Sequence, residues 1–374
     1  MREIEYWIWL TSLEGLSSKK TFDLLEKYKS PDVIYGLSEN DLKNTKGLTE
    51  KNIKELLNSE KRDRVGTIYE AMGRNNIKMV NIYEETYPQK LKNIYDPPIA
   101  LYYMGKLESG NFSIAVVGSR RTTGYGAKTA GRLSYDLSMR GVTIVSGLAR
   151  GIDSIAHKGC LDAGGKTIAV LGSGLDNIYP QENTGLFKDI IDSKGLVLSE
   201  YPPGMPPLQH NFPARNRIIS GISSGVLVIE AAKRSGSLIT AGCALEQGRE
   251  VFAVPGNIDC AYSMGTNQLI KEGAKLVLNA SDILEEFEYS TIQNFTPTYE
   301  DTNKKISTEY LNLFKGLTTD EIKILKVILK GAHNIDEILE RSNISAKDAN
   351  SILFMLEMKG IIGQNPGKLF EVII

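Results

Sequence analysis

Five glycine-containing segments carry the residues that could do chemistry in this sequence. The first, VGSRRTTGYG at residues 117–126, supplies Gly118, Ser119, Arg120 and Arg121. Guanidinium groups make bidentate contacts with phosphate, and the Ser119 hydroxyl can donate a further hydrogen bond. A helix that begins near Thr122 or Thr123 would point its unpaired amides at the same place. The segment therefore predicts an anion site.

This first segment does not fit the common nucleotide-binding patterns. It lacks the GxGxxG spacing, and no Walker lysine follows it. Dinucleotide and nucleoside triphosphate sites are both weakly supported.

The second segment, residues 146–161, reads SGLARGIDSIAHKGCL and places Arg150 at the start of a helix. Asp153 and His157 are four residues apart on that helix and could form an acid–base pair. No nucleophile or metal ligand accompanies them, so a hydrogen bond on the helix surface or a packing contact is favoured. The third segment, LGSGLDNIYPQEN at 171–183, is weak evidence on its own.

The fourth segment, SEYPPGMPPLQHNFPARNRIISG at 199–221, has five prolines between residues 201 and 213. The prolines hold the chain extended. They deliver four residues toward the next helix: Phe212, Arg215, Asn216 and Arg217. Arginines beside an aromatic ring suit single-stranded nucleic acid. Arg217 could instead pair with Glu200 or Glu230, and Arg215 is the arginine favoured to face a ligand.

The fifth segment, which ends in SGSLITAG, supplies Lys233, Arg234, Ser235, Gly236 and Ser237. With a helix starting near Leu238, the serines would cap its N-terminus and the loop would form an anion nest.

Short apolar runs position these segments. They read SIAVVG, VTIVSG, TIAVLG, GLVLSE, GVLVIEA, EVFAVPG and KLVLNA, and stretches of helical length separate most of them. Such runs predict an α/β fold with a Rossmann-like, doubly wound parallel sheet covered on both faces. The five segments follow strands, so they would meet at the carboxyl edge of the sheet, where such folds bind ligands.

Composition limits the class of protein. The 374 residues predict two or three domains, and a formal net charge of −1 requires any nucleic-acid site to be a local cluster of cations. Cys160, Cys243 and Cys260 are widely spaced, which argues against a disulfide framework or a metal cluster and favours a reducing compartment. The N-terminus resembles neither a signal peptide nor a membrane span, so a cytoplasmic location is expected.

The N-terminal region contains a repeat, LEGLSSKKTFDLL at 13–25 and TKGLTEKNIKELL at 45–57. In each copy a helix would end at a glycine and a Ser or Thr would cap the next helix, as in helix-hairpin-helix or SAM-like modules. Binding of a DNA phosphate is one interpretation. A helical packing module is favoured, because each hairpin has one glycine and few flanking cations.

Beyond a polar stretch at 289–316, read as a linker, the C-terminal region predicts helices at 318–329, 334–341 and 345–359 and then a hairpin, which is a winged-helix-like arrangement. Its recognition helix carries only Lys347 and Lys359 as cations, so partner contact or scaffolding is favoured over groove reading. The predicted division is 1–78, 79–288, 289–316 and 317–374.

Eight motifs, including VGSRRTTGYG, SGLARGIDSIAH, FPARNRIISG and GREVFAVPG, agree in order and spacing with the DNA-processing protein A (DprA/Smf) family, so residues 80–290 closely resemble it. The resemblance implies a homodimeric protein without a cofactor that binds single-stranded DNA of any sequence. It also implies protection of incoming DNA in natural transformation and help in loading the RecA recombinase.

The resemblance carries the family's phosphate grip over onto Gly118, Ser119 and Arg120. It carries the FPxRNR segment over onto Phe212, Arg215, Asn216 and Arg217. Family members often have a lysine shortly before Phe-Pro, whereas this chain has Leu208, Gln209 and His210, which predicts weaker DNA binding or a cation supplied from elsewhere.

Two other functions remain open. One is an enzyme acting on nucleotides or nucleotide sugars, with an acid or base among Asp153, His157, Glu200 and Glu230. The other is an adaptor that works through its terminal domains.

Overall fold

The computed structural model describes residues 1–108, 110, 112–287, 317–329, 334–342, 344–365 and 369–372. The chain forms two compact units, Met1–Phe295 and Thr296–Ile374. The stretch predicted as a linker lies outside the described residues.

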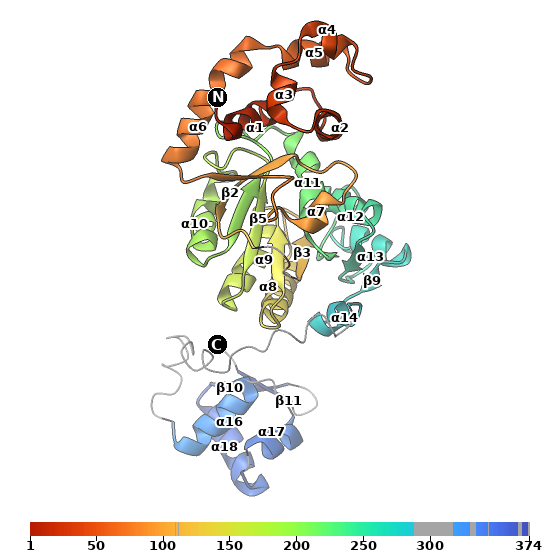
Figure 1. The fold of residues 1–374 in the computed structure, drawn as a ribbon. Coiled ribbons are helices and arrows are strands. Elements are labelled where there is room, and N and C mark those ends of the chain that lie inside the picture. The colour runs from red at the N-terminus through yellow and green to blue at the C-terminus, as the bar shows by residue number, and fades with distance from the viewer. Residues whose placement is uncertain are drawn as a thin grey trace. The chain divides into compact units, whose positions relative to one another are not determined.

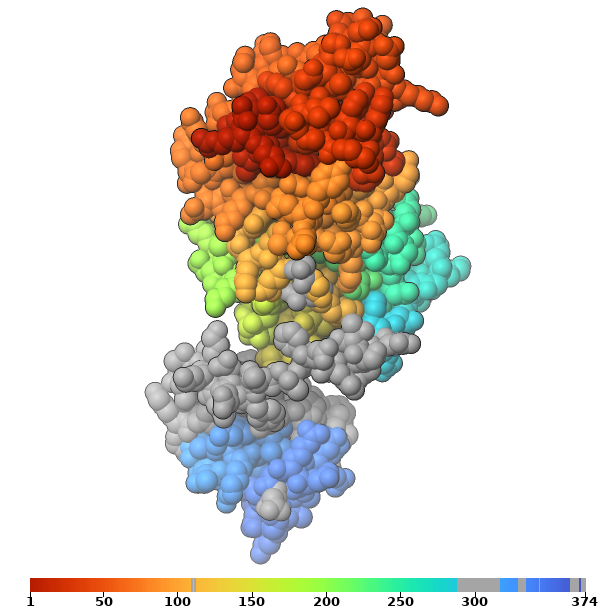
Figure 2. Space-filling model, viewed as in Figure 1, coloured from red at the N-terminus to blue at the C-terminus, as the bar shows by residue number. Residues whose placement is uncertain are grey.

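Short helices make up the N-terminal part of the first unit (Figure 1). They are α1 (Glu3–Thr11), α2 (Ser18–Tyr28), α3 (Pro31–Tyr35), α4 (Glu39–Lys43), α5 (Glu50–Leu56) and α6 (Ser59–Arg74). Trp9, Leu25 and Ile34 are fully or almost fully buried among them. In the space-filling view these helices, coloured red to orange, form a continuous surface with the following residues (Figure 2).

The two halves of the N-terminal repeat form matching hairpins. Gly15 and Gly47 have φ angles of 81° and 92°, a left-handed conformation that glycine adopts without strain. Ser17 caps α2 and Thr49 caps α5, as predicted. The preceding helices end a few residues before each glycine rather than at it, because the turn needs several residues.

A nine-stranded sheet forms the centre of the first unit. Its strands are β1 (Lys78–Asn81), β2 (Ala100–Gly105), β3 (Ser113–Val117), β4 (Thr143–Ser146), β5 (Thr167–Leu171), β6 (Leu196–Ser199), β7 (Gly225–Val228), β8 (Glu250–Ala253) and β9 (Lys275–Leu276). The spatial order is β1-β2-β6-β5-β4-β3-β7-β8-β9. The seven predicted strands are all present and pair in parallel.

The sheet is mixed rather than purely parallel. β1 pairs antiparallel with β2, and β2 pairs antiparallel with β6. Neither strand was predicted from the sequence, because both precede the regular alternation of strand and helix that identified the others.

Helices cover both faces of the sheet. They are α7 (Gln89–Lys92), α8 (Gly124–Ser138), α9 (Ile152–Asp162), the 3₁₀ turn η1 (Gln181–Asn183), α10 (Thr184–Asp192), α11 (Asn211–Ile222), α12 (Gly236–Glu246), α13 (Met264–Lys271) and α14 (Ala280–Leu284). α9 packs against α8 and α10, whereas α11 packs against α7 and α12. Right-handed crossovers place these two groups on opposite faces.

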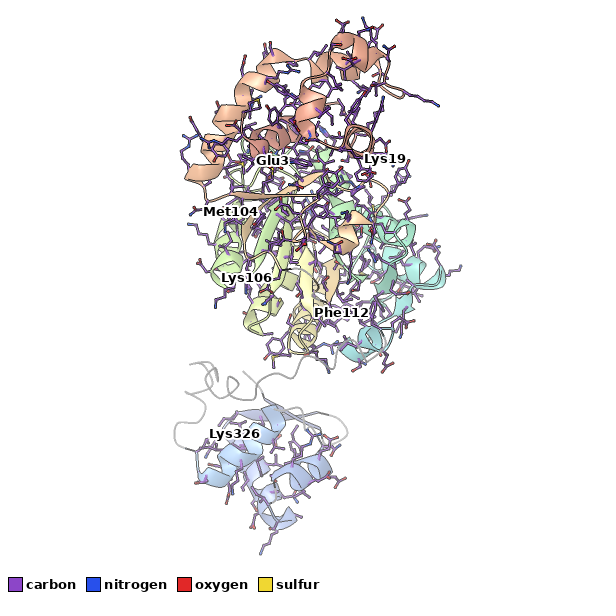
Figure 3. All side chains as sticks on the ribbon, in the orientation of Figure 1. Glu3, Lys19, Met104, Lys106, Phe112 and Lys326 are labelled. Atoms are coloured by element: carbon purple, nitrogen blue, oxygen red, sulfur yellow. The ribbon has the colours of Figure 1, made fainter. Side chains whose placement is uncertain are left out.

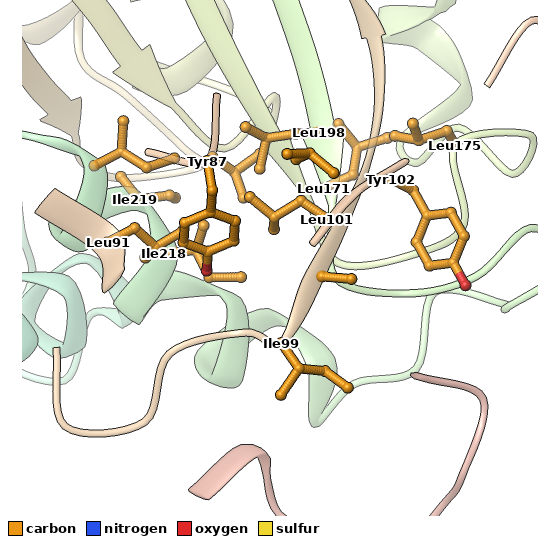
Figure 4. Packing of buried hydrophobic residues seen from close by; sticks show 14 of the residues in the cluster. Tyr87, Leu91, Ile99, Leu101, Tyr102, Leu171, Leu175, Leu198, Ile218 and Ile219 are labelled. Carbon is orange, nitrogen blue, oxygen red and sulfur yellow. The ribbon is translucent and has the colours of Figure 1, made fainter. Parts of the chain in front are cut away.

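The packing under α11 fixes the helix to the sheet. Ile218 and Ile219 of α11 lie in one apolar cluster with Leu101, Leu171 and Leu198 of three strands (Figure 4). All five side chains are essentially buried. Burial of apolar surface on this scale holds α11 in place, since each such side chain contributes roughly 1.5–3 kcal/mol.

The second unit has the predicted order of elements. It comprises α16 (Thr319–Leu329), α17 (Ile335–Ser342), α18 (Ala346–Met358), β10 (Ile362–Asn365) and β11 (Leu369–Val372). The two strands pair antiparallel, and Ile324, Ile338 and Leu356 are buried in a core of their own. This is a winged-helix arrangement. Across the described residues, every helix is too short or too polar to cross a membrane.

Candidate nucleic-acid interface

A cleft of about 760 Å³ opens at the carboxyl ends of the parallel strands. β3 lies between β4 and β7, so the crossovers leave it in opposite directions and create the point where open α/β sheets bind ligands. Phe112 directly precedes β3 and lies at the end of the sheet far from the N-terminal helices (Figure 3). The carboxyl ends of the strands therefore point toward those helices.

Most of the residues proposed from the sequence line this cleft. They are Gly118, Ser119, Arg120, Arg121, Phe212, Arg215, Asn216, Ser235, Gly236 and Ser237. Four do not line it: Arg150, Arg217, Lys233 and Arg234. The other ten residues come from segments far apart in the chain, and they meet at the carboxyl edge of the sheet, as predicted from their positions after the strands.

The loop after β3 is held by the start of α9. Gly151 has φ of 72°, and a Cβ atom there would lie 2.3 Å from the Ser119 carbonyl oxygen. The Ile152 amide donates to that oxygen at 3.2 Å. The Ser119 hydroxyl donates to the Arg121 carbonyl at 2.6 Å. Its hydrogen is thus used within the loop, and Ser119 shapes the loop in this structure.

A carboxylate occupies the N-terminus of α8. Glu230 accepts hydrogen bonds from the Thr123 amide at 3.0 Å and from the Thr122 hydroxyl at 2.8 Å, and also from the Thr123 hydroxyl. Glu230 is 2% exposed. The prediction that the amides at this helix start point at a bound anion is therefore wrong for Thr123, because an internal anion already fills the position.

Cations and aromatic rings meet at the mouth of the cleft. Arg120 and Arg121 are exposed, and within the described part of the chain neither forms an ion pair. The Arg120 guanidinium carbon lies 5.5 Å from the centre of the Phe212 ring. The rings of Phe212 and Tyr179 are 5.5 Å apart and inclined at 45°. Arg120 thus lies beside two neighbouring rings, and Arg121 lines the same cleft.

Arg215 forms part of the cleft wall but is buried, with 3% exposure. It donates to the Gly147 carbonyl at 2.8 Å and also to the Val170 carbonyl. Burial lowers its pKa to about 10, against the attraction of the Asp153 carboxylate, so it stays charged at neutral pH. Gly147 makes room for it, since a Cβ there would lie 2.6 Å from the guanidinium.

Asp153 and His157 do not form the predicted pair on the helix surface. Both are buried, and each has its own partner. Asp153 accepts from the Gly147 amide at 3.1 Å, and burial raises its pKa. His157 Nδ1 lies 2.7 Å from the Thr167 hydroxyl, and burial lowers the pKa of the imidazole to about 3. The prediction of a surface contact is wrong because α9 turns this face toward the sheet.

Two of the predicted arginines are engaged by carboxylates. Arg217 is 8% exposed, and its Nε donates to Asp96 at 2.9 Å while Nη2 donates to Glu200 at 2.7 and 2.9 Å. Pairing with Glu200 was the alternative considered for Arg217. Arg150 is exposed and pairs with Glu182 at 2.8 Å beside the cleft. Exposed ion pairs are screened by solvent and contribute little to stability, so the Arg150 pair can open readily.

The start of α12 closes the other side of the cleft. The helix begins at Gly236, two residues earlier than predicted, with the Ser235 hydroxyl accepting from the Ser237 amide at 3.3 Å. Asn216 donates to the Gly236 carbonyl at 3.3 Å and so joins α11 to α12. Lys233 and Arg234 are exposed in the preceding loop and, among the described residues, have no ion pair.

Several residues of the cleft were not proposed from the sequence. They include Tyr179, Gln209, Ile219, Thr240 and Tyr262. Tyr262 follows β8, the predicted strand EVFAVPG. The sequence analysis did not propose site residues from the loop after this strand, and doing so would have found Tyr262. Within the described ranges, the three cysteines are unpaired and no group of three or more His, Cys, Asp or Glu could hold a metal ion.

The model of the family described as "DNA recombination-mediator protein A" matches residues 78–288, which is more than half of the chain. The chain belongs to this family, DprA. The model of the DprA winged helix domain matches residues 315–368. The family assignment agrees with the resemblance seen in the sequence motifs.

Relatives of the DprA family match over most of their length. Protein Smf of Escherichia coli is 42% identical over 290 residues, covering 76% of this chain and 74% of that protein. The DNA processing protein DprA of Streptococcus pneumoniae is 51% identical over 210 residues, covering 56% and 74%.

Solved structures of two DprA proteins share the fold. The S. pneumoniae structure superposes with a TM-score of 0.66 at 40% identity and covers 77% of this chain and 99% of its own. A Helicobacter pylori DprA structure, which concerns that protein's single-stranded DNA binding mode, has a TM-score of 0.50 at 29% identity and covers 59% and 97%.

Proposed function

We propose that this protein binds single-stranded DNA in the cleft, without strong sequence preference, and acts as a recombination mediator rather than as an enzyme. One observation carries the proposal: among the described residues Arg120 is exposed without an ion pair and lies over the Phe212 ring, which contacts Tyr179, and Arg121, also exposed without an ion pair, lines the same cleft. Guanidinium groups without an ion pair attract phosphates, and accessible aromatic rings such as the exposed Tyr179 and the partly exposed Phe212 stack on bases.

The rings favour a single strand over a duplex. Stacking on a side chain requires an accessible base face, which a duplex hides within its own stack. The arginines would contact the backbone, which is the same for every sequence. Arg215 adds a buried positive charge at the wall of the cleft, where the Asp153 carboxylate is its neighbour.

The contacts of the four acid–base candidates argue against the enzyme hypothesis. Glu200 is bound to Arg217, Glu230 caps α8, and His157 is buried beside Thr167. Asp153 lines the cleft, but its carboxylate accepts the Gly147 amide. A general base must reach a substrate proton, which these contacts hinder.

The same proposal extends to partners. The protein would protect incoming DNA, hand it to a recombinase such as RecA, and act as a homodimer through its central domain. Support for a dimer comes from exposed apolar side chains between the end of β8 and β9: Ile258 in the loop after β8 is 83% exposed, Met264 at the start of α13 is 49% exposed, and Leu276 in β9 is 41% exposed. Ile258→Asp would then convert a dimer into a monomer in sedimentation, whereas a wild-type monomer would refute the dimer.

A titration of the full chain tests the main proposal. A labelled oligothymidylate, a mixed-sequence single strand and the matching duplex are each titrated at two salt concentrations, and labelled nucleoside monophosphates are incubated alongside. We expect similar affinities for both single strands, weaker duplex binding and no turnover of the nucleotides. Preferential duplex binding, or turnover without binding of the oligonucleotides, would refute it.

A further inference from the structure

The first hairpin of the N-terminal helices contacts the central domain through a hydroxyl. Ser18, the first residue of α2, donates to Glu200 Oε1 at 2.9 Å and accepts from Arg217 Nη2 at 2.8 Å. Its neighbour Lys19 lies where α2 meets the central domain (Figure 3). The hydroxyl thus completes a partly buried polar cluster that joins residues 199 positions apart.

This cluster binds Arg217, which lies on the face of α11 that does not line the cleft. On α11, Phe212, Arg215, Asn216 and Ile219 follow the i, i+3, i+4, i+7 spacing of one helical face, and all four line the cleft. Arg217 lies on a different face and reaches Ser18, Glu200 and Asp96 instead. Because both faces belong to the same helix, a displacement of the α11 face that carries Arg217 also displaces the α11 face that lines the cleft.

The repeat itself shows that the contact is specific to one hairpin. When Gly15 is aligned with Gly47, Ser18 aligns with Glu50, which is exposed. The polar contacts of the second hairpin stay among the N-terminal helices, with Tyr28 and Thr45 hydroxyls 2.6 Å apart and Asn52 donating to the Gly15 carbonyl at 2.9 Å. The two copies differ at the position where one of them docks.

We infer that the first N-terminal hairpin is a positioning element of the cleft, acting through Ser18, Glu200 and Arg217 on α11. The inference rests on the proposed single-stranded DNA binding, and it adds that the hairpin contacts the central domain rather than the nucleic acid. Ser18 and Arg217 are positioning residues. These charged hydrogen bonds resist rearrangement, because the Arg217 guanidinium is buried and a buried charge left without its partners is costly.

Amide hydrogen exchange of the full chain tests the inference without DNA. Ser18→Ala removes the hydroxyl and is expected to raise exchange in the amides of residues 206–222, with α10 unchanged. Ser18→Thr keeps the hydroxyl and should restore protection. Thr11→Val is the matched control, because it removes another hydroxyl of the same helices that bonds to Tyr102 at 2.7 Å on β2, away from α11.

DNA affinity gives the second readout. Ser18→Ala is expected to weaken oligothymidylate binding about fivefold, which corresponds to about 1 kcal/mol. The dependence on salt should not change, because the variant still neutralises the same phosphates. Ser18→Thr should bind as the wild type does.

The outcomes separate this inference from the proposed function. Unchanged exchange over residues 206–222 in Ser18→Ala overturns the inference, whether or not the wild type binds DNA. A reduced salt dependence in Ser18→Ala also overturns it, because the hairpin would then contact phosphates directly. Failure of the wild type to bind any oligonucleotide refutes the proposed function, while raised exchange would still support the positioning role.

Discussion

Replacing Arg217 with methionine tests whether this arginine stabilises the fold or binds the ligand. Methionine fills a similar volume, so the change mainly removes the charge. It leaves two carboxylates without their cation: Glu200, whose side chain is 18% exposed, and Asp96, which is 38% exposed. Breaking a buried pair costs about 3–5 kcal/mol, and solvent screening of Asp96 places the expected loss near the lower value, about 3 kcal/mol.

Urea unfolding of the full chain, followed by tryptophan fluorescence, measures this loss. Trp7 and Trp9 lie buried in the same compact unit as Arg217, so they report on its unfolding. Arg120→Met is the control, and because Arg120 is exposed without an ion pair among the described residues, its effect should stay within about 0.5 kcal/mol. Arg217→Met should keep the wild-type salt dependence of DNA binding. Unchanged stability with a reduced salt dependence would refute the reasoning and place Arg217 on the DNA.

Three further variants test separate parts of the structure. Gly126→Ala should destabilise the protein by about 2 kcal/mol in urea unfolding, because a Cβ would lie 2.2 Å from the Glu230 carboxyl group. Gly124→Ala is the control and should have a small effect, because a Cβ there meets nothing within 4 Å. Equal losses of stability in the two variants would contradict the account. His157 has a pKa of about 3 in the folded protein, below the ordinary value of 6.5. As pH falls, His157 is therefore protonated in the unfolded chain before it is protonated in the folded protein, so the free energy of unfolding decreases between about pH 6.5 and pH 3. Between pH 7 and pH 5 this amounts to about 2 kcal/mol, and His157→Gln should remove that part of the pH dependence, whereas an unchanged profile would refute the neutral buried imidazole. Phe212→Leu should weaken oligonucleotide binding by about 1–3 kcal/mol with the salt dependence intact, and unchanged affinity would exclude stacking.

Much of this architecture follows from local sequence signals. Apolar runs such as SIAVVG and TIAVLG are too uniformly apolar for a half-exposed strand, and they lie in the interior of the sheet as β3 and β5. Because parallel strands end at one edge, their terminal loops had to meet there. The convergence of Arg120, Phe212 and Ser235 on one cleft follows from that topology.

The partners of individual side chains could not be read in the same way. Arg215 and Arg217 are two residues apart, yet one lies beside Asp153 at the cleft and the other reaches Asp96 and Glu200. Their difference depends on the rotation of α11 against the sheet and on a hydroxyl in the N-terminal helices. Glu230 at the start of α8 is a similar case, since the carboxylate comes from a segment 107 residues away from Thr123.

The salt dependence of oligothymidylate binding by Arg120→Ala tests the central claim most directly. The claim is that exposed guanidinium groups at the cleft neutralise phosphates of a single strand. The logarithm of affinity should fall less steeply with the logarithm of salt, by about 0.7 for each phosphate that the variant no longer neutralises. Raising salt from about 50 to 200 mM should then weaken the wild type about 2.6-fold more than the variant. Parallel salt dependences for the two proteins would contradict the claim.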